Sequence, residues 1–195
     1  MPRLWTQTIV EHRAAVTEAV LETAASLVAH HGLRGVTMSR IAEQSGIGRA
    51  TLYKYFPDVE SILGAWHQRQ VDQHFERLAA ARDRADEPID RLLAVLHEYA
   101  AVIQGVRRHG DPELAATLHR AGRMGDAERR LRAMLLELIR QAVSAGHVRA
   151  DVPAGRLADY CLAALSATAT SPSAADRDRL VEVIVSGLRP GSSTA

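Results

Sequence analysis

One short stretch of the chain concentrates side chains that can bind a nucleic acid. Six positions combine hydrogen-bond donors with methyl groups: Arg49, Ala50, Thr51, Tyr53, Lys54 and Tyr55. The guanidinium group of Arg49 can donate two hydrogen bonds to guanine, and the methyl groups of Ala50 and Thr51 can contact the methyl group of thymine. Long donors such as Lys54, the only lysine in the chain, can reach phosphate oxygens. These residue types together predict a surface that reads DNA.

Such a surface needs two short helices that cross closely, and the flanking sequence predicts both. We expect helices over about Met38–Ser45 and Arg49–Tyr55, joined through Gly46, a residue that accepts a positive φ. Ala42 is small enough for the close crossing, and Leu52 can pin the second helix to its support. Two short helices joined through a glycine are typical of a helix-turn-helix.

The rest of the chain is predicted to be helical as well. No segment alternates apolar and polar residues with the period of a strand, and Gly, Pro and Asp separate segments with helical periodicity. The sequence therefore predicts an all-α protein of about nine helices. Besides the two above, we expect helices over about Glu11–His31, from Asp58 onward, and over Ile89–Arg107, Glu113–Ala121, Ala127–Ala145, Ala154–Thr168 and Ala174–Leu188.

Composition excludes several classes of protein. The 195 residues carry a formal net charge of +1, which excludes a polycation that coats nucleic acid. Basic charge is instead local, because the segment from Arg34 to Tyr55 contains four basic residues and only one acid, Glu43. The single cysteine, Cys161, excludes an intrachain disulfide and a cysteine-built zinc site. No apolar run reaches the roughly 18 residues of a membrane span, and the first residues lack the apolar core of a signal peptide, so we expect a soluble, cytoplasmic protein.

The sequence offers no catalytic centre, cofactor site or metal site. Motifs for a serine nucleophile, a phosphate-binding loop and a zinc-binding helix are all missing. His67 and His74 lie seven residues apart on one helix face, which is too far for a shared ion without other ligands. We therefore expect neither an enzyme nor a metalloprotein.

The segment from about Ala14 to Leu63 has a long helix ending in His-Gly, then Gly-Val-Thr, Ile-Ala-x-x-x-Gly-Ile and Thr-Leu-Tyr-x-Tyr-Phe. With these motifs it resembles the tetracycline-repressor (TetR) family of bacterial transcription regulators. The resemblance implies that Thr37 and Ser39 contact backbone phosphate, and that the six positions from Arg49 to Tyr55 contact bases and phosphates.

The chain departs from the family pattern at two positions. Gly48 stands at the N-cap of the second short helix, where the family usually has serine. Val59 stands where the family usually has a lysine that holds phosphate. Lys54 or Arg40 is then left to supply that contact.

The resemblance also implies an architecture and a mechanism. It implies a DNA-binding domain over residues 1–58 and a domain for effector binding and dimerisation over residues 59–195. A homodimer would bind a palindromic operator in double-stranded DNA, and a small-molecule effector would release it. Candidate effector-binding residues are Trp66, His67, Gln70, His74, Phe75, His97, Tyr99, Ile103 and His119. Candidate dimer-interface residues on the last two helices are Leu157, Tyr160, Cys161, Ala164, Leu165, Leu180, Val183, Ile184 and Leu188.

Other interpretations of these residues stay open at this point. Periodicity fits the internal core as well as a dimer interface for the last two helices. Tyr55 can pack beneath its helix instead of contacting DNA, and Phe56 is assigned mainly to the core. For the whole chain, the alternatives are a helical protein-interaction module with a degenerate DNA reader and, more remotely, a helical enzyme.

Overall fold

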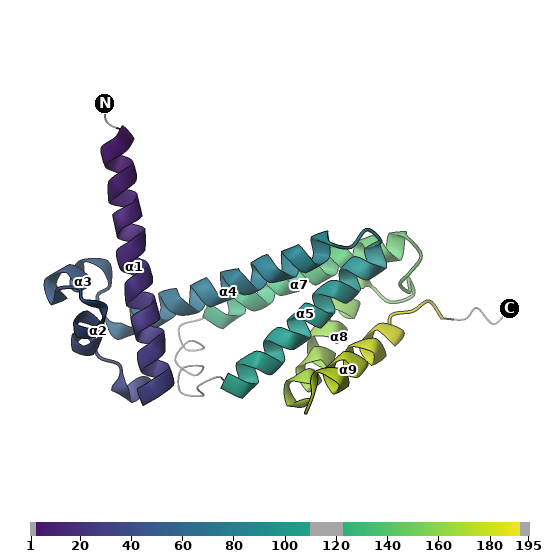
Figure 1. Ribbon diagram of the computed structural model, residues 1–195. Coiled ribbons are helices and arrows are strands. Elements are labelled where there is room, and N and C mark those ends of the chain that lie inside the picture. The colour runs from purple at the N-terminus through teal and green to yellow at the C-terminus, as the bar shows by residue number, and fades with distance from the viewer. Residues whose placement is uncertain (1–2, 110–122, 192–195) are drawn as a thin grey trace. The chain divides into compact units, whose positions relative to one another are not determined.

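The part of the chain that the structure describes is built from helices. A computed structural model describes residues 3–109 and 123–191, and these residues form eight α-helices, two short 3-10 helices and no strand (Figure 1). The all-α prediction is confirmed, and the helix predicted over Glu113–Ala121 lies outside the described residues. The α-helices are α1 (Arg3–His31), α2 (Met38–Ser45), α3 (Arg49–Tyr55), α4 (Val59–Asp83), α5 (Pro88–His109), α7 (Arg123–Ser144), α8 (Ala154–Leu165) and α9 (Ala174–Ser186); the 3-10 helices are η1 (Leu33–Gly35) and η2 (Ser166–Thr170).

Local capping signals fix most of these bounds. α2 and α3 begin and end at the predicted residues. α4 begins directly after Asp58, whose carboxylate accepts a hydrogen bond of 2.7 Å from the backbone N–H of Ser61, as an N-cap residue does. α1 begins at Arg3, well before the predicted Glu11, because no helix-breaking residue stands between them.

The prediction for the end of α8 is wrong. α8 ends at Leu165 and the chain continues as η2, whereas the sequence predicted an α-helix to Thr168. Hydroxyl groups explain the change: Ser166 donates to the carbonyl of Ala163 and Thr168 to that of Leu165, each three residues back. Side-chain bonds of this kind compete with the α-helical ladder and favour the tighter 3-10 turn.

The described residues divide into two compact units, residues 3–70 with 123 and residues 71–109 with 124–191. The division falls inside α4, and the domain boundary at residue 58 stays a prediction. Among the described residues, no helix is both long enough and apolar enough to cross a membrane.

The first unit has a small core shared by its four helices. α1 contributes an apolar face, and the other helices contribute a few side chains each. The buried residues are Val20, Leu21, Ala24, Leu27, Val36, Ile41, Ala42, Leu52, Phe56, Ile62 and Leu63. This core positions α2 and α3 on α1.

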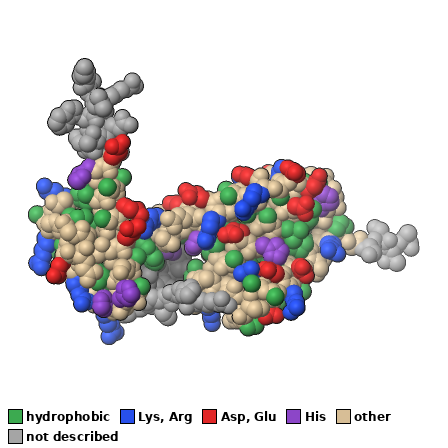
Figure 2. All heavy atoms as spheres, in the orientation of Figure 1, with side chains coloured by type: hydrophobic (Ala, Val, Ile, Leu, Met, Phe, Trp, Pro, Cys, Tyr) green, Lys and Arg blue, Asp and Glu red, His purple; other side chains and the backbone are tan. Residues whose placement is uncertain are grey.

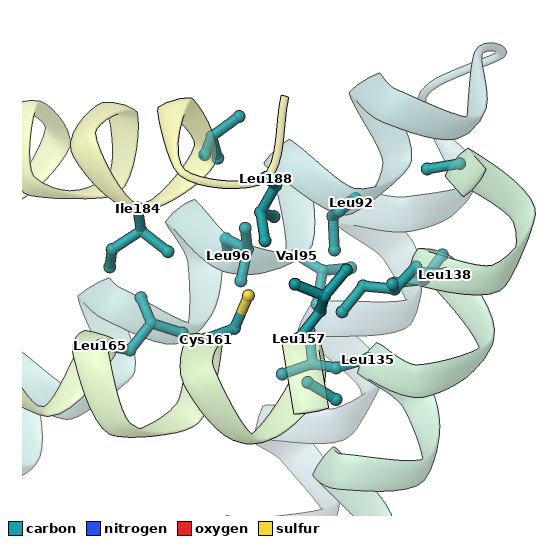
Figure 3. Packing of buried hydrophobic residues seen from close by; sticks show 14 of the residues in the cluster. Leu92, Val95, Leu96, Leu135, Leu138, Leu157, Cys161, Leu165, Ile184 and Leu188 are labelled. Carbon is teal, nitrogen blue, oxygen red and sulfur yellow. The ribbon is translucent and has the colours of Figure 1, made fainter. Parts of the chain in front are cut away.

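The second unit has a larger core, to which α4, α5, α7, α8 and α9 all contribute. Figure 3 shows leucines of α5 and α7 pointing toward Cys161 and Leu165 of α8 and toward Ile184 and Leu188 at the end of the chain. Polar contacts join the same helices at their edges. The side chain of Arg132 on α7 donates a hydrogen bond of 2.7 Å to Asp159 on α8, and this bond lowers the pKa of the Asp159 carboxyl group.

A buried glutamine connects α5 to the start of α9. The Nε2 of Gln104 donates to the carbonyls of Ser171 (2.9 Å) and Ser173 (3.4 Å), and its Oε1 accepts a hydrogen bond of 3.2 Å from Arg177. Because a buried amide is costly unless it is hydrogen-bonded, these contacts fix the loop before α9 on α5.

Candidate nucleic-acid interface

α3 presents one face to the core of the first unit and the other to solvent. Leu52 is completely buried and anchors the helix. The remaining predicted contact residues of the helix, apart from Tyr55, are exposed: Arg49, Ala50, Thr51, Tyr53 and Lys54. Tyr53 is 55% exposed, so most of this large aromatic side chain does not pack in the core. Figure 2 shows Lys and Arg side chains gathered along the edge of this unit where α3 lies.

The turn between α2 and α3 is built around Gly46. This residue ends α2 with φ 70° and ψ 15°, the left-handed conformation that glycine adopts without strain. The N–H of Ile47 then donates 3.1 Å to the carbonyl of Ala42, which completes a Schellman motif. Gly48 caps α3 through its backbone carbonyl alone, without a side-chain hydrogen bond. The turn therefore sets the angle at which α3 leaves α2.

The start of α2 lies beside the same surface. The Oγ1 of exposed Thr37 accepts a hydrogen bond of 3.2 Å from the N–H of Arg40 and thereby caps the helix. The cap uses the oxygen as an acceptor, so the hydroxyl hydrogen is still available to donate to a phosphate. Ser39 is half-buried. The Arg40 guanidinium donates 3.0 Å to the carbonyl of Gly35 and is held close to η1.

Tyr55 and Phe56 end α3 on its inner side. Phe56 is buried in the core, as predicted, and Tyr55 is half-buried against it. The guanidinium of Arg13 on α1 lies over the Tyr55 ring, 5.7 Å from its centroid. Sequence reasoning missed Arg13, because no local pattern connects a residue of α1 with one of α3.

At the start of α4, Val59 stands in place of the lysine of the family pattern. Val59 is half-buried and packs against the core of the first unit. Lys54 is exposed on α3, whereas Arg40 is exposed but hydrogen-bonded to Gly35. Lys54 is therefore the better placed of the two to supply a phosphate contact.

Sequence models of two protein families match the chain, one over the features described above and one over the second unit. "Bacterial regulatory proteins, tetR family" matches residues 20–65, which hold α2, α3 and most of their core. "Transcriptional regulator SbtR-like, C-terminal domain" matches residues 87–190, more than half of the chain. The chain belongs to the TetR family of bacterial transcriptional regulators.

Individual TetR-family proteins agree with this assignment. The transcriptional repressor KstR2 of Mycobacterium tuberculosis is 27% identical over 141 residues, which cover 68% of this chain and 69% of KstR2. A TetR/AcrR-family regulator from Thermobifida fusca has the same fold, with a TM-score of 0.69 at 21% identity over 89% of this chain and 98% of that one. The fold is also that of AibR, solved with isovaleryl coenzyme A and operator DNA, with a TM-score of 0.61 at 22% identity over 90% and 98% of the two chains.

The residues predicted for the dimer interface differ in how far the chain itself buries them. Five of the nine pack in the core of the second unit and are almost completely buried there (Figure 3): Leu157, Cys161, Leu165, Ile184 and Leu188. Periodicity marks an apolar stripe but does not say which element covers it. The other four stay a prediction: Tyr160 and Val183 are 41% and 62% exposed, and Ala164 and Leu180 are half-buried.

The predicted effector residues are divided between the two units. Trp66, His67 and Gln70 belong to the first unit, where Trp66 packs against the core. Phe75, Tyr99 and Ile103 pack against the core of the second unit, to which His74 also belongs, and His119 lies outside the described residues. The pKa of the Tyr99 hydroxyl is raised, mainly because the group is buried and secondly because of the negative charge of Glu128.

His97 and Phe75 lie beside charged residues of neighbouring helices. His97 lies 3.5 Å from a carboxylate oxygen of Asp178 on α9, so its side chain is directed to the surface between α5 and α9. Phe75 borders an open groove of about 750 Å³ between α4 and α7. Arg130 lies over the Phe75 ring at 4.1 Å and donates 2.8 Å to Asp72. No group of three or more potential metal ligands occurs among the residues that the structure describes.

Proposed function

We propose that this TetR-family regulator is a homodimeric repressor that binds a palindromic operator and is released by a small-molecule effector. The observation that carries the proposal is the surface of α3, on which five donor or methyl-bearing side chains are exposed around one buried anchor, Leu52. We assign DNA binding to residues 1–58, and effector binding and dimerisation to residues 59–195.

In the proposed complex, α3 enters the major groove of the operator. Arg49 donates to guanine, and Ala50 and Thr51 contact thymine methyl groups. Tyr53 and Lys54 donate to phosphates on the groove edge and fix the register of the helix. At the start of α2, Thr37 and Ser39 contact phosphate in the same way, and Tyr55 contributes its outer edge.

A dimer supplies the second half of the recognition surface. One short helix reads too few base pairs for specific binding, and a twofold dimer reads two half-sites about 34–36 Å apart, or a multiple of that distance. The exposed apolar positions of α8 and α9 support an interface there: Tyr160, Ala164, Leu180 and Val183. The operator would then be palindromic, because its symmetry follows that of the protein.

The effector acts through the second unit. An effector that binds one state of the dimer more tightly shifts the population toward it and weakens DNA binding if α3 no longer fits both half-sites. AibR has been solved with an acyl coenzyme A ligand and operator DNA, which makes acyl thioesters the first compounds to test. A wider screen of hydrophobic and cationic molecules can use the melting temperature, because a ligand that binds only the folded state stabilises it.

Selection of bound sites from random double-stranded DNA, followed by footprinting, tests the proposal. We expect a palindrome whose half-site spacing reports the dimer geometry. Against the selected site, Tyr53→Ala and Lys54→Ala should each weaken binding by about tenfold or more while the melting temperature stays unchanged, since both side chains are exposed.

Two results would contradict this proposal. One is full operator affinity in both variants, which would remove α3 from the interface. The other is binding that does not respond to ionic strength, because phosphate contacts release counterions and make the affinity of a DNA-binding protein fall with salt.

A further inference from the structure

α1 extends beyond the part of the first unit that it helps to hold together. Residues 11–15 are exposed without exception, and Val20 is the first buried residue among the described side chains of the helix. The helix nevertheless continues outward to Arg3 (Figure 1). The core of the first unit therefore does not account for the outer turns of α1.

One side chain of this outer segment lies against the recognition helix. The Arg13 guanidinium lies over the ring of Tyr55, and Tyr55 in turn packs against the core. The guanidinium carbon lies 5.7 Å from the ring centroid, within the range of a cation–π contact. Such a contact uses none of the five N–H donors of the guanidinium, so they are available for an anion.

The charges around Arg13 favour a polyanion as that partner. Arg49 and Lys54 are exposed on α3, the helix to which Tyr55 belongs. The nearest acid in sequence, Glu11, is two residues away and is therefore turned by about 200° around the helix axis. Glu18, farther along α1, forms an ion pair with Arg69. Arg13 thus contacts a helix whose two charged side chains, Arg49 and Lys54, are both basic.

We propose that Arg13 is an additional contact to the DNA backbone, made from α1 to a phosphate flanking the groove that α3 enters. The inference rests on the proposed DNA-binding function and adds a third element to the interface, beside α2 and α3. Arg13 then has two roles, because it supplies charge to the interface and braces Tyr55 at the end of α3.

The salt dependence of binding separates a phosphate contact from a merely structural role. The probe is a fluorescent duplex of random sequence about three helical turns long, which needs no knowledge of the operator. Log affinity falls with log salt by about 0.9 for each phosphate contact to duplex DNA. We expect Arg13→Ala to reduce this slope by about 0.9 for each Arg13 in contact and to weaken binding at low salt by about tenfold. Arg13→Lys keeps the charge and should recover most of the slope.

A matched control is Arg140→Ala on α7, which removes the same charge from another exposed position. Its slope should equal that of the wild type, and circular dichroism should show unchanged helix content in all variants. A wild-type slope in Arg13→Ala would overturn the inference while leaving the proposed function intact, even if affinity fell, because Arg13 would then only brace Tyr55. A wild-type protein that binds no duplex at low salt would overturn both.

Discussion

At the scale of single residues, the clearest chemical consequence concerns the lone thiol. Cys161 is completely buried in the core of the second unit, and burial raises the pKa of its thiol from 9.0 to about 12. The thiolate is the reactive form of cysteine. Cys161 is neither ionised near neutral pH nor accessible to solvent. Cys161 is therefore a packing residue, and its reactivity reports on the folding of the second unit.

We expect the native protein to resist thiol reagents at pH 8 and to react with one equivalent once it is unfolded. Stability should respond at higher pH as well. The unfolded thiol ionises near pH 9 and the folded one near 12, so Cys161 favours the folded state fully below pH 9 and progressively less from 9 to 12. The pH dependence of the free energy of unfolding, measured for wild type and Cys161→Ala, isolates this contribution. Rapid labelling of the native protein would show that the second unit opens.

At the scale of elements, the turn between α2 and α3 is the most constrained part of the candidate interface. Gly46 has a positive φ and no side chain near it, so the backbone conformation and not space dictates glycine there. Gly48, two residues on, has φ −59°, and an added Cβ would meet only Thr51 Oγ1 at 4.0 Å. The backbone conformation therefore requires glycine at position 46 but not at position 48.

Gly46→Ala should destabilise the protein by about 1–2 kcal/mol, the cost of a left-handed conformation for a residue with a Cβ. Gly48→Ala is the control and should change stability by less than about 0.5 kcal/mol, because its backbone conformation suits alanine. Urea denaturation monitored by circular dichroism measures both. Equal effects of the two substitutions would mean that the positive φ is not the reason for glycine at position 46.

The sequence predicts those features of the helices whose signals are local in the chain, and it does not predict contacts between distant segments. The predicted bounds of α2 and α3 agree with the structure because Gly46, the residue that joins the two helices, is a local signal. The exposed face of α3 followed from the same periodicity that buries Leu52. Contacts between distant segments left no local signal: Arg13 over Tyr55, and Gln104 with the loop before α9, appear only in the folded chain. For the last two helices, periodicity identified an apolar face, but packing within the chain covers much of it.

At the scale of the whole molecule, the proposed dimer depends on what remains exposed on α8 and α9. Val183 on α9 is 62% exposed, and Val106 on α5 is 57% exposed. Two valines of similar exposure on different helices allow a matched comparison. Only the first lies on the face assigned to the dimer.

Val183→Glu should convert the proposed dimer to a monomer, because a carboxylate buried in an apolar interface loses its hydration. Val106→Glu should leave the dimer intact. Sedimentation velocity measures the oligomeric state of both variants. The melting curve of each variant shows whether folding is affected. A Val183→Glu protein that is still dimeric at micromolar concentration would place the interface on another surface.

The exposed lysine on α3 also determines where the protein reacts with reagents that acylate amines. Because Lys54 carries the only side-chain amine in the chain, an acylating reagent or an acetyl transfer to lysine has one side-chain target, and that target contacts a DNA phosphate in the proposed complex. Acylation neutralises its charge. Operator occupancy could thus be followed, without any substitution, as protection of a single ε-amino group from acylation.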